Sequence, residues 1–160
     1  MKTIQELQPT AIWRYFHDIT QIPRPSKKEG KILAYLLEFA SKHALEATQD
    51  QAGNILITKP ATPGREDAPT VILQSHVDMV CEKNAGVKHD FDNDPIETII
   101  DGDWIRANGT TLGADNGIGV AAQLAVLAAD EIKHGRIEAL FTVDEETGLT
   151  GANSLSREFL

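Results

Sequence analysis

Five side chains in three separate segments have the chemistry of a metal-dependent hydrolytic site. Each segment lies beside an apolar stretch, and the five residues are His76, Asp78, Asp115, Glu145 and Glu146. Zinc accepts imidazole nitrogen and carboxylate oxygen, and a catalytic zinc ion keeps one coordination position open for water. One histidine combined with four acids therefore predicts a site that holds two divalent metal ions and activates water.

Asp115 is the predicted bridge between the two ions. It lies in the stretch Leu-Gly-Ala-Asp-Asn-Gly-Ile-Gly at 112–119, where glycines let the backbone bend tightly and leave the carboxylate uncovered. A carboxylate has two oxygens and can span two metal ions that are roughly 3.5–4 Å apart. His76 and Glu146 are predicted to bind one ion each.

The other two acids are predicted to act without binding metal. Asp78 follows His76 by two residues and would orient the imidazole ring, as carboxylates beside ligand histidines do. Glu145 is the predicted general base, which would take a proton from water whose pKa the metal has lowered to near neutral. Adjacent residues of an extended chain point in different directions, so Glu146 can bind metal while Glu145 stays free.

Each segment alone has a simpler interpretation. A histidine after a strand is commonly a hydrogen-bonded structural residue, and an aspartate among glycines commonly forms a turn. A run of Asp-Glu-Glu also suits the start of a solvated helix. The metal-site hypothesis depends on the three segments occurring together, and a non-catalytic metal-binding module is the alternative from a different class.

Apolar periodicity and turn residues predict the elements that hold these side chains. Helices are expected from Pro9 to Pro23, from a capping box at Ser26–Glu29 to about His43, over 118–129 and over 149–160. Strands are expected over 47–49, 55–59, 70–75 and 137–143, with a hairpin formed by 97–100 and 104–107.

Alternating strands and helices predict an α/β fold. We expect a three-layer sandwich with a mixed, largely parallel sheet and helices on both faces. The segment 70–75 is largely apolar and is expected to be a buried strand. Ligands collect at the carboxyl ends of the strands in such sheets, and both His76 and Glu145 follow a strand end.

Composition limits the class of protein and its partners. The 160 residues include 15 basic and 24 acidic ones, and the net charge of −9 disfavours a nucleic-acid partner. No apolar run is long enough to cross a bilayer, and the N-terminus has no signal-like apolar core, so we expect a cytoplasmic protein without a membrane partner. Cys81 is the only cysteine, which excludes an intrachain disulfide.

Three motifs resemble those of the aminoacyl-histidine dipeptidases, also called Xaa-His or carnosine-type dipeptidases. They are Ser-His-Val-Asp-Met-Val at 75–80, Leu-Gly-Ala-Asp-Asn-Gly-Ile-Gly at 112–119 and Asp-Glu-Glu-Thr-Gly-Leu-Thr-Gly-Ala at 144–152. The resemblance runs from about Pro9 to the last residue. It places the chain among the co-catalytic zinc peptidases.

The resemblance implies a metallodipeptidase that hydrolyses small dipeptides, those with a histidine after the first residue being the expected substrates, with two divalent ions. Zinc is the expected metal, with cobalt or manganese as alternatives. The resemblance assigns the five side chains the roles described above, and it implies a cis peptide bond between Asp115 and Asn116. An N-deacylase or a carboxypeptidase with the same two-metal site is the alternative activity.

The family pattern also needs groups that these 160 residues do not contain. They are a further carboxylate, a late histidine and a second, lid-like domain. We therefore expect residues 1–160 to be the N-terminal part of a catalytic domain, without a second domain and inactive by itself. The oligomeric state stays open and includes a homodimer of the full-length enzyme.

Overall fold

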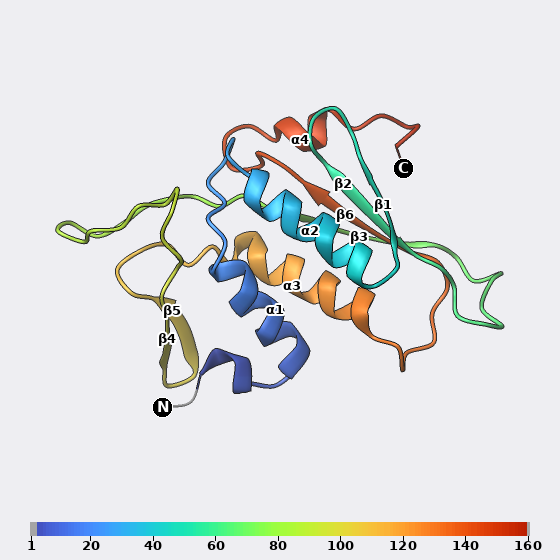
Figure 1. The fold of residues 1–160 in the computed structure, drawn as a ribbon, viewed down its shortest axis with the longest axis horizontal. Coiled ribbons are helices and arrows are strands. Elements are labelled where there is room, and N and C mark those ends of the chain that lie inside the picture. The colour runs from blue at the N-terminus through green and yellow to red at the C-terminus, as the bar shows by residue number, and fades with distance from the viewer. Residues whose placement is uncertain (1–2, 160) are drawn as a thin grey trace.

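The computed structural model describes residues 3–159 as one mixed sheet with helices packed on it and a separate hairpin (Figure 1). The helices are η1 (Ile4–Glu6), α1 (Thr10–Thr20), α2 (Gly30–Lys42), α3 (Ala114–Ala128) and α4 (Thr150–Asn153). The strands are β1 (Glu46–Gln49), β2 (Ile55–Lys59), β3 (Val71–His76), β4 (Thr98–Asp101), β5 (Trp104–Ala107) and β6 (Ile137–Thr142). The predicted α/β class and mixed sheet are confirmed, but among the described strands of the main sheet only the β3–β6 pairing is parallel, so this part of the sheet is not largely parallel as expected.

The main sheet has the strand order β1-β2-β6-β3. β1 and β2 are antiparallel, as are β2 and β6, whereas β3 runs parallel to β6. The register places His76, the last residue of β3, opposite Thr142, the last residue of β6. The carboxyl ends of these two strands therefore meet at one edge of the sheet, as the sequence predicts for the segments after them.

Strand β3 is less buried than its sequence predicts. It lies at the edge of the sheet and pairs with β6 alone among the described strands, and Val71 and Ile72 are 51% and 49% exposed. Only its last two residues, Ser75 and His76, are buried. The expectation of a buried strand was wrong for its first half, because apolar composition does not tell a central strand from an edge strand.

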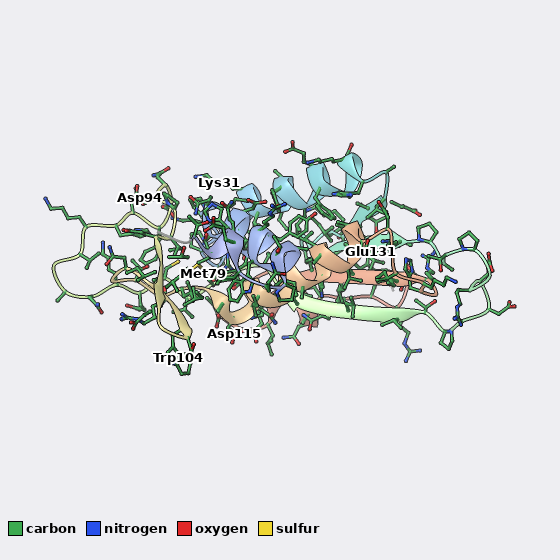
Figure 2. The ribbon with its side chains drawn as sticks, turned by 90° about the horizontal axis from the view of Figure 1, so that it is seen from below. Lys31, Met79, Asp94, Trp104, Asp115 and Glu131 are labelled. Carbon is green, nitrogen blue, oxygen red and sulfur yellow. The ribbon has the colours of Figure 1, made fainter. Side chains whose placement is uncertain are left out.

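Helices α1, α2 and α3 lie on the same side of the sheet (Figure 2). Each presents a buried apolar stripe at helical spacing. The stripes are Phe16 and Ile19 in α1, Ile32, Leu36 and Phe39 in α2, and Val120, Leu124 and Leu127 in α3. Burial of each large apolar side chain contributes about 1.5–3 kcal/mol, so this core holds the sheet and α3 in a fixed relation.

Two predicted helix boundaries were wrong. Helix α2 begins at Gly30 with Glu29 as its N-cap and no side-chain capping bond, since Ser26 donates its hydroxyl to Asp78 instead. The helix expected over 149–160 is only the four residues of α4, and Leu160 lies outside the described residues. Ser154 turns its hydroxyl onto the carbonyl of Thr150, a local bond that competes with helix continuation.

The remaining elements lie outside the main sheet. The hairpin of β4 and β5 forms as predicted, around a two-residue turn at 102–103. The loops 60–69 and 81–95 extend from opposite ends of the molecule (Figure 1). In the described part of the chain, no helix has both the length and the apolar character that crossing a membrane requires.

Candidate metal centre

The parallel pairing of β3 and β6 brings two of the three predicted segments together. Val77 continues the pairing beyond β3, because its N–H donates to the carbonyl of Thr142 at 2.9 Å. The chain then turns at Asp144, whose φ of 48° directs Glu145 and Glu146 back toward His76. His76 and the two glutamates thus lie at the same sheet edge although they are far apart in sequence.

The third segment reaches this edge as the start of α3. Asp115 and Asn116 have non-helical backbone angles within that helix, and the peptide bond between them is cis, as expected. Gly119 lets the turn fold tightly, because a Cβ atom there would lie 2.0 Å from the Asn116 amide oxygen. Figure 2 places Asp115 near one end of α3 and Glu131 near the other.

Distances from the imidazole of His76 define the centre. Its Nε2 atom lies 3.1 Å from Asp115 Oδ1 and 3.8 Å from Glu145 Oε2. Ligand atoms of His76, Glu145 and Glu146 all lie within 4.8 Å of one another. The structure therefore brings together the three predicted metal ligands and the predicted base.

Asp78 lies beneath the centre and is fully buried. Its Oδ1 accepts hydrogen bonds from His76 Nδ1 at 3.3 Å and from the Glu145 N–H at 3.0 Å. Its Oδ2 accepts from the Ser26 hydroxyl at 2.7 Å and the Glu146 N–H at 3.2 Å. Burial alone would raise the pKa of Asp78, but these four donors lower it well below its usual value.

The same contacts govern the protonation of His76. Burial by itself would lower its pKa, but hydrogen bonds to Asp78 and Asp115 outweigh burial and raise the pKa to about 9. The pKa of Glu146 is raised, first by burial and then by the neighbouring acids, against the opposing effect of His76. This concentration of negative charge around one imidazole favours a bound cation.

Two clefts flank the centre. One, of about 290 Å³, is lined by His76, Asp115 and Glu145 together with apolar side chains such as Leu149. The other, of about 350 Å³, is lined in part by Glu146, Cys81 and Ser26. Glu145 and Glu146 therefore face different clefts, as adjacent residues of an extended segment are expected to do.

A second group of acids nearby is structural. Ligand atoms of Glu29, Asp78 and Asp144 also lie within 4.8 Å of one another, and all three residues are buried. Glu29 accepts from the Asp144 N–H, and the Asp144 carboxylate accepts from the hydroxyls of Thr147 and Thr150. Because hydrogen-bond donors already satisfy these oxygens, this group holds the 144–150 turn in place.

The donor set at the first centre fits divalent metal ions. It combines one imidazole nitrogen with oxygens of Asp115 and Glu146, the ligand types that zinc prefers, and Glu145 lies beside them. Asp78 holds Nδ1 of His76, which leaves Nε2 directed toward Asp115 and the cleft. Both the ligand types and the orientation of the ring thus suit a two-metal site.

Two residues of the centre were missed from sequence. Arg24 and Ser26, in the connector between α1 and α2, bind the 77–78 segment through side-chain hydrogen bonds. In the sequence this Pro-Arg-Pro-Ser stretch is explained as a helix end followed by a cap. A basic residue between two prolines was the available signal, but it does not reveal partners more than 50 positions away.

Comparisons with known proteins agree with this geometry. Over all 160 residues the chain is 47% identical to the cytosol non-specific dipeptidase of Escherichia coli (strain K12), covering 33% of that protein. The crystal structure of aminoacylhistidine dipeptidase from Vibrio alginolyticus matches with a TM-score of 0.97 and 50% identity, over 99% of this chain and 32% of that one. The chain thus spans about a third of the length of these relatives.

A more distant structure shares the fold alone. It is the Bacillus subtilis YXEP protein, described as a dinuclear metal binding peptidase from the M20 family, with a TM-score of 0.52 and 16% identity. That match covers 86% of this chain and 36% of the other. The model of peptidase family M20/M25/M40 matches residues 72–159, which are more than half of the chain and contain all three motifs. The chain therefore belongs to peptidase family M20/M25/M40.

Proposed function

We propose that the protein carrying this chain is a metal-dependent dipeptidase that hydrolyses aminoacyl-histidine dipeptides. The observation that carries the proposal is the convergence of His76, Asp115, Glu145 and Glu146 at the joined ends of β3 and β6. Two relatives that match the whole chain or nearly so are named as dipeptidases, one a cytosol non-specific dipeptidase and the other an aminoacylhistidine dipeptidase. Both are about three times longer, so the activity proposed is that of the whole protein.

In this proposal three side chains bind the metal ions. His76 would hold one ion through Nε2, Glu146 would hold the other, and Asp115 would bridge them. When bound, the two divalent ions would polarise the scissile carbonyl and lower the pKa of a water molecule toward neutrality. The name of the YXEP protein supports two ions rather than one, and zinc, or else cobalt or manganese, suits the nitrogen and oxygen donors.

Of two further residues, one would transfer protons and the other would orient a metal ligand. Glu145, in the cleft with His76 and Asp115, would take a proton from water at its carboxylate and pass it to the leaving amine nitrogen. Asp78 would keep the His76 ring fixed through Nδ1, so that Nε2 faces the cleft. General acid–base catalysis of this kind contributes about 10²–10⁴-fold.

The remaining parts of the proposal concern the whole protein. We propose that residues 1–160 are the N-terminal part of its catalytic domain, and that this part alone hydrolyses no dipeptide. A cytosolic location is proposed from the name of the Escherichia coli relative. An N-deacylase or carboxypeptidase would use the same five residues and would be separated from a dipeptidase by its preferred substrate.

Paired substitutions in the full reading frame test the assigned roles. Glu145→Gln keeps the size of the side chain but cannot accept a proton, so turnover of β-alanyl-histidine should fall about 10²–10⁴-fold with two metal ions retained. Glu146→Gln replaces an anionic ligand by a neutral one and should lose one ion. Glu131→Gln, on an exposed residue near the opposite end of α3, is the matched control.

Metal content by mass spectrometry and turnover are measured for each variant. Loss of metal in Glu145→Gln with both ions kept in Glu146→Gln would reverse the two roles. Unchanged turnover in both would leave the acids as a solvated turn and refute the proposal. A substrate panel of aminoacyl-histidine dipeptides, other dipeptides and N-acyl amino acids then separates the alternative activities.

A further inference from the structure

The guanidinium of Arg24 is buried directly beneath the metal centre. The residue is only 2% exposed. Arginine is rarely buried unless its donors have partners, so the partners of Arg24 need to be identified. Its Nη1 donates to the carbonyls of Val77 at 2.9 Å and Asp78 at 3.1 Å, and its Nη2 donates to the carbonyl of Gly113. One side chain therefore joins two loops that are more than thirty positions apart in sequence.

These two loops carry the ligands that must face the same ion. Val77 directly follows His76, and Gly113 lies two residues before Asp115. The backbone of Arg24 adds a further tie to the first loop, because its carbonyl accepts from the Met79 N–H at 3.2 Å. The position of the guanidinium thus sets how far the His76 segment lies from the Asp115 turn.

The glycines of the Asp115 loop are shaped around this guanidinium. A Cβ atom on Gly113 would lie 2.4 Å from Arg24 Nη2, and one on Gly117 would lie 2.7 Å from the same nitrogen. Real Cβ atoms do not approach a neighbour so closely, so any larger residue at either position would displace the guanidinium. Two glycines of the motif at 112–119 therefore make room for Arg24.

A guanidinium suits this place better than an ammonium group. Its planar fork carries five N–H donors in fixed directions, so it can hold carbonyls of two loops at once. A lysine has a single nitrogen and cannot span the same acceptors with the same geometry. Burial lowers the pKa of Arg24 to about 10, and the negative charges of Asp78 and Glu146 oppose that effect, so the guanidinium stays cationic at neutral pH.

We propose that Arg24 is a positioning residue, which holds the His76 and Asp115 loops at the separation that lets both side chains face one metal ion. The inference rests on the proposed metal-dependent function and extends it to a residue that binds neither metal nor substrate. Residues that orient ligands from outside the metal shell affect metal affinity or activity by about 10–100-fold. An effect of that size is therefore expected at Arg24.

A matched pair of substitutions separates positioning from stability. Lys59 is another largely buried cation that donates to backbone carbonyls, those of Val126 and Ala129 at the far end of α3. Arg24→Met and Lys59→Met each remove a buried cation and its carbonyl bonds, so both should lower the melting temperature. Only Arg24→Met should change the metal centre.

The readouts are cobalt affinity, the visible absorption of bound cobalt and the electron paramagnetic resonance of the dicobalt form. They are measured on the full-length protein. We expect Arg24→Met to weaken cobalt binding about 10–100-fold and to alter both spectra, with Lys59→Met unchanged in all three. Arg24→Lys should give the same loss as Arg24→Met. If Arg24→Met binds cobalt as tightly as Lys59→Met and has the wild-type spectra, Arg24 is merely structural and the inference is overturned.

Two further variants keep the test decisive. If Arg24→Met does not fold, Gly117→Ala retains the arginine but displaces Nη2, and wild-type cobalt spectra in that variant would equally overturn the inference. Asp115→Asn tests the proposed centre itself. Unchanged cobalt binding in Asp115→Asn would overturn the proposed function, whereas loss there with wild-type binding in Arg24→Met would overturn the Arg24 inference alone.

Discussion

Asp78→Asn should destabilise the metal-free protein and weaken metal binding at the same time. The substitution keeps the shape of the side chain but replaces one acceptor oxygen by an NH₂ group and removes the charge. Oδ1 accepts from two N–H groups, those of His76 and Glu145, whereas Oδ2 accepts from one N–H and the Ser26 hydroxyl. The new NH₂ group should occupy the position of Oδ2, because the Ser26 hydroxyl there can rotate and accept a hydrogen bond from it.

The contacts set the expected size of the effect. The Glu146 N–H would lose its acceptor, and an unsatisfied buried donor costs about 1–3 kcal/mol. The hydrogen bonds from His76 and Glu145 would go to a neutral amide oxygen instead of a carboxylate, and each would contribute about 1 kcal/mol less than it does to the charged acceptor. Together these losses amount to about 3–5 kcal/mol of unfolding free energy. Metal affinity should fall about 10–100-fold because the His76 ring is less firmly oriented.

Urea unfolding of the metal-free protein and cobalt titration measure the two effects. The pKa of Asp78 is lowered in the folded protein, so its stabilisation is present above the unfolded pKa of about 3.9 and is lost as the pH falls toward the folded pKa. The difference between wild type and variant should therefore be full at pH 7 and shrink toward pH 3. Asp90→Asn makes the same exchange on an exposed loop carboxylate and should leave the unfolding free energy nearly unchanged.

Two results would refute this reasoning. If Asp78→Asn matched the stability of the wild type at pH 7, the four hydrogen bonds would not hold the sheet edge together. If stability fell as expected but cobalt affinity and stoichiometry did not change, Asp78 would support the fold without orienting His76. Either outcome would show that Asp78 does not have the role proposed for it.

Two further predictions concern His76 and Gly119. The pKa of His76 is raised from 6.5 to about 9 in the folded protein, so the stabilisation by protonated His76 should be complete below pH 6.5 and disappear as the pH rises through 9. In urea unfolding of the metal-free protein, the unfolding free energies of wild type and His76→Gln should differ by roughly 3 kcal/mol at pH 6 and converge by pH 10. Gly119→Ala would place a Cβ atom against Asn116, so it should lower the unfolding free energy by about 1–3 kcal/mol and weaken cobalt binding. In the control Gly30→Ala the new Cβ atom would meet nothing within 4 Å, so this variant should be as stable as the wild type or more stable. Equal stability of the two alanine variants would contradict the packing argument.

The elements that local chemistry determines were predictable from sequence. The hairpin of β4 and β5 follows from turn residues between short apolar runs, and α3 follows from an alanine-rich segment with apolar residues at helical spacing. The residues that follow each strand were also predictable, because the apolar strand before them is a local pattern. His76 and Glu145 were each expected after a strand end, where ligands collect, and the parallel pairing of β3 with β6 brings those two ends to one edge.

What the sequence did not reveal depends on contacts between distant segments. Arg24 and Ser26 find their partners more than fifty positions away, and no local pattern records such a contact. The shortness of α4 has a different, local origin, because the Ser154 hydroxyl donates to the Thr150 carbonyl and this bond competes with helix continuation. The edge position of β3 is set by the order of strands, which composition does not encode.

That edge position has a consequence for handling the chain by itself. Among the described residues no strand pairs with the outer side of β3, so a row of backbone N–H and C=O groups faces outward there. Val71 to Ser75 contains neither a charged residue nor proline, and its first two side chains are half exposed. Natural proteins protect such edges with lysine, proline or a bulge, and an unprotected one is a template for intermolecular β-pairing. Preparations of the isolated 160 residues should therefore aggregate through β3, and a lysine in place of Ile72 should keep them monomeric.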